Sequence, residues 1–285
     1  MNKKILILSL LLVLMTSCAY APTHKHSTTD LYDSVLMDFD FGDKFIGFEI
    51  QTMDEKTIET IPTHSKNKLI IYLSEGCSTC IEVLRSLNRL ENIFLSDQFD
   101  YLICWENQIP VNLLEKYEVE KDKNVSLKGE TRLSSISPTF FLLNEDNIVD
   151  FSTSDFQIMI DKLFSDKILT KNQLQENANK YILDKLTNSN ETNNLIFFSM
   201  EGCPDCMEVE PIISSSVIQN IYDVTTIYRS NDPKDGRLLD NYNIFRQVYD
   251  IEWYPSFLIL DGIEDYYFIG ETSIEDLENL LLTLQ

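Results

Sequence analysis

The feature that most constrains this chain is a pair of cysteines two residues apart, which occurs twice and is followed each time by a proline. The pairs are Cys77/Cys80 and Cys203/Cys206, and the prolines are Pro138 and Pro255. Each pair follows an apolar run, and an amphipathic pattern of helical spacing follows each pair. This order predicts a strand, a turn and a helix that begins at the first cysteine. Free backbone N–H groups and the positive end of the helix dipole favour a thiolate there, so the spacing suits dithiol chemistry.

The N-terminal segment has the pattern of an export signal. Lys3 and Lys4 precede an apolar or small stretch, residues 5–15, which ends at Thr16-Ser17-Cys18. The stretch is about half of the roughly 20 residues that a transmembrane helix needs. Residues 1–17 are therefore expected to be a signal peptide. The segment 14–18 resembles a bacterial lipoprotein signal, which would make Cys18 the lipidated N-terminus; an ordinary cleaved signal with an incidental cysteine is the alternative.

Length and charge restrict the class of protein. Without the signal peptide the chain has 268 residues, enough for about two domains of roughly 150 residues each. The net charge is −23, or −25 once the two lysines of the signal are removed. No cluster of Lys and Arg offers a footprint for phosphates, so nucleic acid is not expected as a partner. Export to an oxidising compartment would allow disulfides to form.

The hydrophobic pattern predicts a similar order of elements in both halves, and hence an α/β fold with a mixed central sheet and helices on both faces. In the first half we expect strands at 45–50, 57–60, 69–73 and 101–105, helices at 78–95, 111–117 and 155–164, a surface insertion at 119–135 and a hairpin at 139–151. In the second half we expect strands at 195–199 and 223–229, helices at 204–220 and 237–249, a hairpin at 256–269 and a last helix capped by Thr272 and Glu275. A helix capped by Thr170 and Gln173 joins the halves.

Both halves resemble thioredoxin-fold domains. In the second half the match lies in Cys203-Pro204-Asp205-Cys206, Pro211 and Tyr254-Pro255. The first half, with its leading strands and Ser137-Pro138, is similar to the TlpA/ResA-like redoxins that bacteria export on lipid anchors. The resemblance implies two tandem thioredoxin-like domains, at 41–165 and 191–285, joined by a helical linker at 166–190 and preceded by a lipid-anchored tether at 18–40.

The resemblance also implies roles for single residues. Cys77 and Cys203 would be the attacking thiolates, and Cys80 and Cys206 would resolve the mixed disulfides, each pair forming its own disulfide. Pro138 and Pro255 would be cis, and Ser137 and Tyr254 before them would contact the substrate. No cofactor and no metal ligand is expected. The sequence departs from the family at Gly76 and Gly202, where tryptophan is usual, and at Ile71 and Phe197, where a buried acid is usual.

These residues predict a thiol-disulfide oxidoreductase, reductive in direction, at the outer face of the cell membrane. Its partners would be disulfide-containing or dithiol proteins outside the cytoplasm and an electron donor in the membrane. Two alternatives stay open: a binding module in which the disulfides only brace the fold, and a scaffold in which the four cysteines bind zinc. Cys104, inside an apolar run, is expected to be a buried strand residue.

The charges beside the cysteines differ between the halves. The four acids Glu201, Asp205, Glu208 and Glu210 flank Cys203 with no base nearby in the sequence, whereas Arg85 offsets Glu75 and Glu82 around Cys77. Because like charge disfavours a thiolate, the pKa of Cys203 is expected to lie above that of Cys77.

Overall fold

The computed structural model describes residues 36–46, 48–58, 67–94, 99–129, 131–187, 193–230, 238–261, 266–269 and 274–283. The expected signal peptide, Cys18 and most of the expected tether lie outside these ranges. Residues 34–285 form one compact unit. Within the described ranges, none of the helices has the length and apolar character needed to cross a bilayer.

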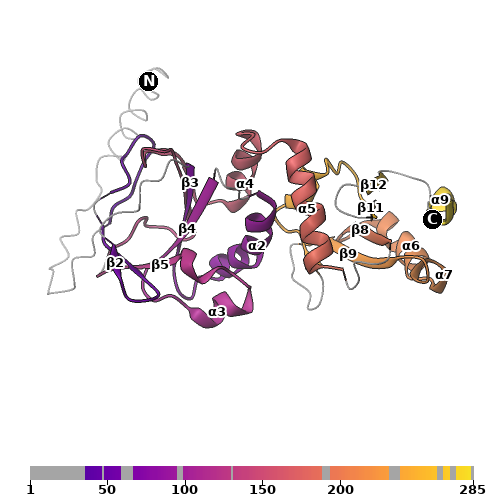
Figure 1. Cartoon of the computed structure of the whole chain (residues 1–285), viewed down its shortest axis with the longest axis horizontal. Coiled ribbons are helices and arrows are strands. Elements are labelled where there is room, and N and C mark those ends of the chain that lie inside the picture. The colour runs from indigo at the N-terminus through magenta and orange to yellow at the C-terminus, as the bar shows by residue number, and fades with distance from the viewer. Residues whose placement is uncertain are drawn as a thin grey trace, which may run out of the picture. The chain divides into compact units, whose positions relative to one another are not determined.

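The first half is built on a seven-stranded sheet of described residues, in the order β2-β1-β5-β4-β3-β6-β7 (Figure 1). Its central strand β3 pairs in parallel with β4 and antiparallel with β6, which in turn pairs antiparallel with β7. The strands are β1 (Ile50–Thr52), β2 (Thr57–Ile58), β3 (Asn67–Leu73), β4 (Phe99–Trp105), β5 (Asn124–Leu127), β6 (Thr139–Leu143) and β7 (Val149–Thr153). The helices are α2 (Ser78–Phe94), α3 (Val111–Lys116), the short 3-10 helix η1 (Lys121–Lys123) and α4 (Phe156–Ser165).

The second half repeats this arrangement in a five-stranded sheet of order β10-β9-β8-β11-β12. Strand β8 pairs in parallel with β9 and antiparallel with β11, which pairs antiparallel with β12. The strands are β8 (Asn194–Met200), β9 (Asp223–Arg229), β10 (Leu238–Leu239), β11 (Ser256–Leu260) and β12 (Tyr266–Ile269). The helices are α6 (Pro204–Ile213), α7 (Ser216–Gln219), α8 (Ile244–Val248) and α9 (Ile274–Thr283).

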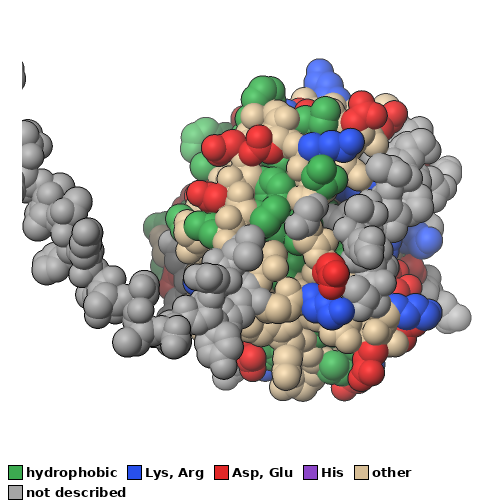
Figure 2. Space-filling view, turned by 90° about the vertical axis from the view of Figure 1, so that its left-hand side faces the viewer, with side chains coloured by type: hydrophobic (Ala, Val, Ile, Leu, Met, Phe, Trp, Pro, Cys, Tyr) green, Lys and Arg blue, Asp and Glu red, His purple; other side chains and the backbone are tan. Residues whose placement is uncertain are grey.

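The two faces of the first sheet are covered differently. Leu69 and Ile71 of β3 pack in one apolar cluster with residues of α2 and α4. Ile70 and Tyr72 point to the opposite face, because side chains alternate along a strand, and pack with an aromatic cluster from residues 39–48. In the first half, this aromatic segment therefore covers the sheet face on which a helix was expected. The second sheet has helices on both faces, with α6 and α9 on one and α8 on the other. The outer surface of the first half mixes acidic, basic and apolar side chains (Figure 2).

Helix α5 (Lys171–Lys185) connects the two halves and carries the predicted capping box of Thr170 and Gln173. It packs against α8 and against α2, beside which it lies in Figure 1. Its buried residues Leu174, Ala178 and Ile182 belong to the same apolar cluster as α2 and one face of the second sheet. The segment expected to be a helical linker is thus part of a continuous core.

Several predicted elements were wrong in position or type. Residues 119–135 are not a surface insertion, because β5 within them pairs with β1 and β4 in the sheet. The strand was missed because charged residues surround its short run of buried side chains. Asn124, its first residue, is buried and accepts a hydrogen bond of 2.8 Å from the indole of Trp105 in β4. The strand expected at 45–50 begins only at Ile50, since Phe45 and Phe48 are both buried at a spacing that a strand would put on opposite faces.

The two predicted helices of the second half were too long. The helix expected at 204–220 ends at Ile213, and Ser215 caps the separate helix α7 by accepting the N–H of Ile218. The helix expected at 237–249 begins only at Ile244, because Asn243 before it has a left-handed backbone with φ of 54°. Residues 238–239 instead form a short strand beside β9. Thr272, the expected cap of the last helix, lies outside the described residues.

Glu91 on α2 should make the stability of the fold depend on pH. Burial, and after it the negative charge of Glu120, raises the pKa of Glu91 from 4.5 to about 7. The folded state keeps this proton where the unfolded chain has lost it, so the free energy of unfolding falls as the pH rises through this range. We expect Glu91→Gln to raise the free energy of unfolding by about 1 kcal/mol at pH 8, allowing for solvent screening, and to leave it unchanged at pH 4. Denaturant titration at both pH values measures this; equal effects would contradict it.

Candidate redox sites

The first candidate site lies where β3 turns into α2. Cys77 and Cys80 form a disulfide with their Cα atoms 5.2 Å apart, as predicted. The turn before them needs Gly76, whose φ of +79° is disfavoured for residues with a side chain. The backbone N–H of Cys80, in the first turn of α2, points at the Sγ of Cys77 at 3.1 Å. A negative charge on this sulfur would therefore be stabilised by an N–H group and by the helix dipole.

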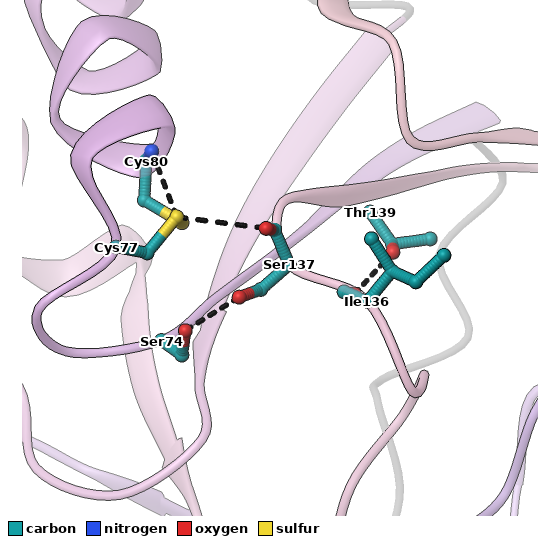
Figure 3. The surroundings of a disulfide bond; sticks show 6 residues. All are labelled: Ser74, Cys77, Cys80, Ile136, Ser137 and Thr139. Atoms are coloured by element: carbon teal, nitrogen blue, oxygen red, sulfur yellow. Dashed lines mark hydrogen bonds between the residues drawn. A yellow bond between two sulfur atoms is a disulfide. The ribbon is translucent and has the colours of Figure 1, made fainter.

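The loop before β6 lies against this disulfide. Figure 3 shows the backbone carbonyl of Ser137 directed at the Sγ of Cys77, at a distance of 3.5 Å. The Ser137 hydroxyl hydrogen-bonds with that of Ser74, at the end of β3. The hydroxyl of Thr139 donates to the carbonyl of Ile136 at 2.6 Å and so fixes the other side of the loop. The Ser137–Pro138 peptide is cis, as the resemblance implied.

The second candidate site has the same geometry. Cys203 and Cys206 form a disulfide, also as predicted, with their Cα atoms 5.3 Å apart. The backbone N–H of Cys206 points at the Sγ of Cys203 at 3.1 Å, and the carbonyl oxygen of Tyr254 lies 3.5 Å from the same sulfur. The Tyr254–Pro255 peptide is cis. The structure thus brings Ser137 and Tyr254 next to the cysteines from which they are distant in sequence.

The two sites differ in access to solvent. Cys77 is half-buried, whereas Cys203 is only 6% exposed. Desolvation disfavours the charged form of a thiol, so burial adds to the acids in opposing a thiolate at Cys203. The second cysteine of each pair is buried in both sites.

Two of the three acids around the first site, Glu82 and Glu106, form ion pairs. Arg85 forms an ion pair of 2.8 Å with Glu82, and its guanidinium lies 5.7 Å from the centre of the Tyr117 ring. Arg132 forms an ion pair of 2.7 Å with Glu106, which follows β4. The third acid, Glu75, is exposed and forms no ion pair with a described residue.

The charges around the second site are less balanced. Glu201, Asp205, Glu208 and Glu210 are exposed, and no described residue forms an ion pair with any of them. No base lies near Cys203 in the sequence, but the fold brings Arg229, at the end of β9, and Arg246, in α8, to the Tyr254 side chain. Burial raises the pKa of the Tyr254 hydroxyl, and the positive charge of Arg229, which hydrogen-bonds with this side chain, opposes the shift. The local excess of acid remains.

Three further expectations concerned the buried acid position, Cys104 and metal ligands. Ile71 and Phe197 are buried, so neither site has a carboxyl group at that position of its central strand. Cys104 is a free thiol buried in β4, and burial raises its pKa. Within the described part of the chain, no group of three or more His, Cys, Asp and Glu side chains is placed to hold a metal ion.

Sequence reasoning missed Asp240 and Arg89. Asp240, between β10 and α8, is buried and accepts the backbone N–H groups of Ile244 at 2.9 Å and Phe245 at 3.1 Å. Its carboxylate also faces Arg89 of α2, at 3.8 Å. Burial raises the pKa of Asp240, and the charge of Arg89 and these N–H groups oppose the rise. The only sequence signal was an arginine on the apolar side of a helical pattern, which is a weak one.

The strand order decides the fold. In both halves, a parallel pair of strands joined by the cysteine-bearing helix continues into an antiparallel hairpin, in the orders β4-β3-β6-β7 and β9-β8-β11-β12. In both, the loop that enters the hairpin carries the cis-proline beside the disulfide. The chain has the thioredoxin fold. The first thioredoxin-like half adds β5, β1 and β2 beyond β4.

Comparisons with known proteins found only distant similarity. No family model and no curated protein matches the chain. Among solved structures, a thioredoxin-like protein from Bacteroides caccae is 14% identical, with a TM-score of 0.34, over 44% of this chain and 49% of that one. The thioredoxin domain of a thiol-disulfide oxidoreductase from Bacteroides vulgatus is 12% identical, with a TM-score of 0.36, over 45% of this chain and 95% of that one. The exposed lipoprotein thioredoxin Etrx1 from Streptococcus pneumoniae is 15% identical, with a TM-score of 0.31, over 41% of this chain and 98% of that one.

Proposed function

We propose that this protein is a thiol-disulfide oxidoreductase that exchanges disulfides with other proteins at both thioredoxin-like sites. The observation that supports the proposal best is the repeated geometry: a disulfide at a helix N-terminus, with its first sulfur 3.5 Å from a backbone carbonyl of the proline loop. A structural disulfide needs neither feature. Two independent occurrences in one chain make a purely bracing role the weaker explanation.

In the reductive direction the reaction follows from these residues. The thiolate of Cys77 or Cys203 attacks one sulfur of a substrate disulfide, and the other substrate sulfur leaves as a thiolate. The thiol of Cys80 or Cys206 then loses its proton and attacks the mixed disulfide. This step releases the second substrate thiol and forms the intramolecular disulfide seen here. Two electrons pass to the substrate, and a dithiol donor must return them.

The backbone of each proline loop suits the binding of an extended substrate. Because the carbonyls of Ser137 and Tyr254 lie beside the attacking sulfurs, a substrate strand that pairs with this backbone would bring its own cysteine within reach. We assign substrate contact to Ser137, Pro138, Tyr254 and Pro255 on this basis. We also propose attachment to the outer face of the cell membrane through Cys18, for which the N-terminal sequence pattern is the support.

The absence of an acid from the buried position before each cysteine pair, in the central strands, favours one rival, a non-catalytic binding module. With Ile71 and Phe197 in the central strands, no carboxylate there can take the proton of Cys80 or Cys206. We therefore expect slow turnover rather than none, since water or a substrate group can accept the proton.

A direct test is the reduction of insulin disulfides by the full chain with dithiothreitol as donor. We expect the wild-type protein to accelerate the reaction, and Cys77→Ser/Cys203→Ser to lower the rate to the background of dithiothreitol alone. Cys104→Ser, which removes a buried thiol of the same chain, should leave the rate unchanged. A wild-type rate equal to background would favour the binding module.

The two sites should differ in reduction potential. The acids around Cys203 and its burial both disfavour a thiolate, which makes the reduced second site less stable and the better reductant. We expect the second disulfide to be harder to reduce by roughly tenfold in equilibrium constant, with the difference lowered by salt. Electrons would then run from the second site to the first. Each site can be titrated in glutathione buffers in the full chain while the other pair is Cys→Ser; a second site that is equally or more oxidising would contradict this direction.

A further inference from the structure

Two large apolar side chains stand exposed beside the second disulfide. Trp253 and Met207 are each 63% exposed. Met207 directly follows Cys206 in α6, and its backbone N–H donates to the carbonyl of Cys203 at 3.3 Å. Trp253 directly precedes Tyr254, whose carbonyl lies 3.5 Å from the Cys203 sulfur. The two side chains therefore come from the two elements that meet at this sulfur.

The backbone that carries Trp253 is fixed rather than loose. Its carbonyl accepts a hydrogen bond of 2.7 Å from the hydroxyl of Ser256, the first residue of β11. An exposed tryptophan on a fixed loop loses little conformational entropy when it is covered, and large aromatic side chains dominate the energetics of protein interfaces. This position is therefore suited to contact with a partner.

Acidic residues flank both apolar side chains in the sequence. Asp205, Glu208 and Glu252 are exposed, and none of them has an ion-pair partner among the described residues. Two bases lie close to the neighbouring Tyr254 side chain, Arg229 and Arg246, and offset part of this negative charge. The first site has less of both: Ile136 is 58% exposed in the matching loop, Glu82 and Glu106 are paired with arginines, and Glu75 is exposed without an ion pair among the described residues. The second site thus presents two exposed apolar side chains beside three acids without ion pairs, more of both than the first site.

We propose that the second site selects protein partners whose reactive cysteine lies in an extended segment with an apolar or aromatic neighbour and with Lys or Arg nearby. This inference rests on the thiol-disulfide exchange proposed above and adds the partner's chemistry. The apolar neighbour would cover Trp253 and Met207, and the cationic groups would face Asp205, Glu208 and Glu252. Complementary charge raises the rate of encounter by about tenfold to 10³-fold at low ionic strength, and salt removes the gain.

The test uses the full chain with Cys77→Ser/Cys80→Ser, so that only the second site exchanges. Its reduced form is mixed with three peptides of equal length, each carrying one cysteine as a mixed disulfide with glutathione. One peptide has phenylalanine and two lysines around the cysteine, one has phenylalanine and two glutamates, and one has glycine and two lysines. We expect the first to react roughly tenfold faster than either of the others at low salt, and its advantage over the glutamate peptide to vanish at 1 M salt.

Variants separate the two contributions. Trp253→Ala should slow the phenylalanine peptides and leave the glycine peptide unchanged, whereas Asp205→Asn/Glu208→Gln/Glu252→Gln should abolish the preference for lysine. The matched controls are Val217→Ala, an exposed apolar residue of α7, and Asp261→Asn, an exposed acid after the far end of β11. Both should leave all three rates unchanged. Equal rates for the three peptides would overturn the selectivity while exchange itself stands; no exchange with any peptide would overturn the redox function of this site as well.

Discussion

Replacing Asp240 by alanine should lower the free energy of unfolding by about 3–5 kcal/mol. The substitution leaves the guanidinium of Arg89 buried, with only 6% of its side chain exposed, and without the carboxylate that faces it at 3.8 Å. It also removes the acceptor for the first N–H groups of α8. A buried charge without its partner is among the most destabilising changes that one substitution can make.

The matched control is Asp250→Ala. Asp250, also in the second half, forms an ion pair with Lys171 of α5, but this pair is exposed, so its loss should cost no more than about 1 kcal/mol. Urea denaturation of the full chain measures both variants. Adding Arg89→Ala to Asp240→Ala should cost less than Arg89→Ala costs in the wild-type background, because the two groups act as a pair. Equal losses for Asp240→Ala and Asp250→Ala would mean that burial of the pair contributes nothing.

Cys80→Ser and Cys206→Ser should each trap partner proteins in mixed disulfides at the altered site. Without the resolving sulfur, the bond between the partner and Cys77 or Cys203 has no intramolecular thiol to break it. We expect covalent complexes that migrate as larger species without reductant and disappear with it, and no such complexes for the wild-type protein. The control variants are Cys80→Ser with Cys77→Ser, and Cys206→Ser with Cys203→Ser, which lack the attacking sulfur and should trap nothing at that site. Complexes that persist in these double variants would place the attacking thiol elsewhere.

The sites could be predicted from the sequence because their determinants are local. The spacing of Cys77 and Cys80, the glycine before them and the proline before β6 each specify a piece of backbone that tertiary packing need not supply. The same holds for the capping box at Thr170, which fixes the start of α5. Such signals repeat in both halves, so each half supports the interpretation of the other.

Features that depend on packing could not be predicted in this way. The strand β5 is a four-residue segment among charges, and what makes it a strand is its place between β1 and β4. Arg89 on the apolar side of α2 gave no sign that a carboxylate far along the chain would meet it. Likewise, Arg229 reaches the second site only because β9 ends beside it, and no window of sequence around Cys203 contains it.

The continuous core around α5 determines whether the two halves of this protein can be separated, by truncation in the laboratory or by gene rearrangement during evolution. Two modules joined by a loose linker can be separated, shuffled or lost one at a time. Here α5 shares its apolar cluster with both halves, and the amide of Asn179 accepts a buried hydrogen bond of 2.6 Å from Tyr249. A fragment ending before residue 193 would expose this surface and leave Arg89 without Asp240. We therefore expect related proteins either to retain both halves with both redox sites or to lack both, because neither half is stable without the other.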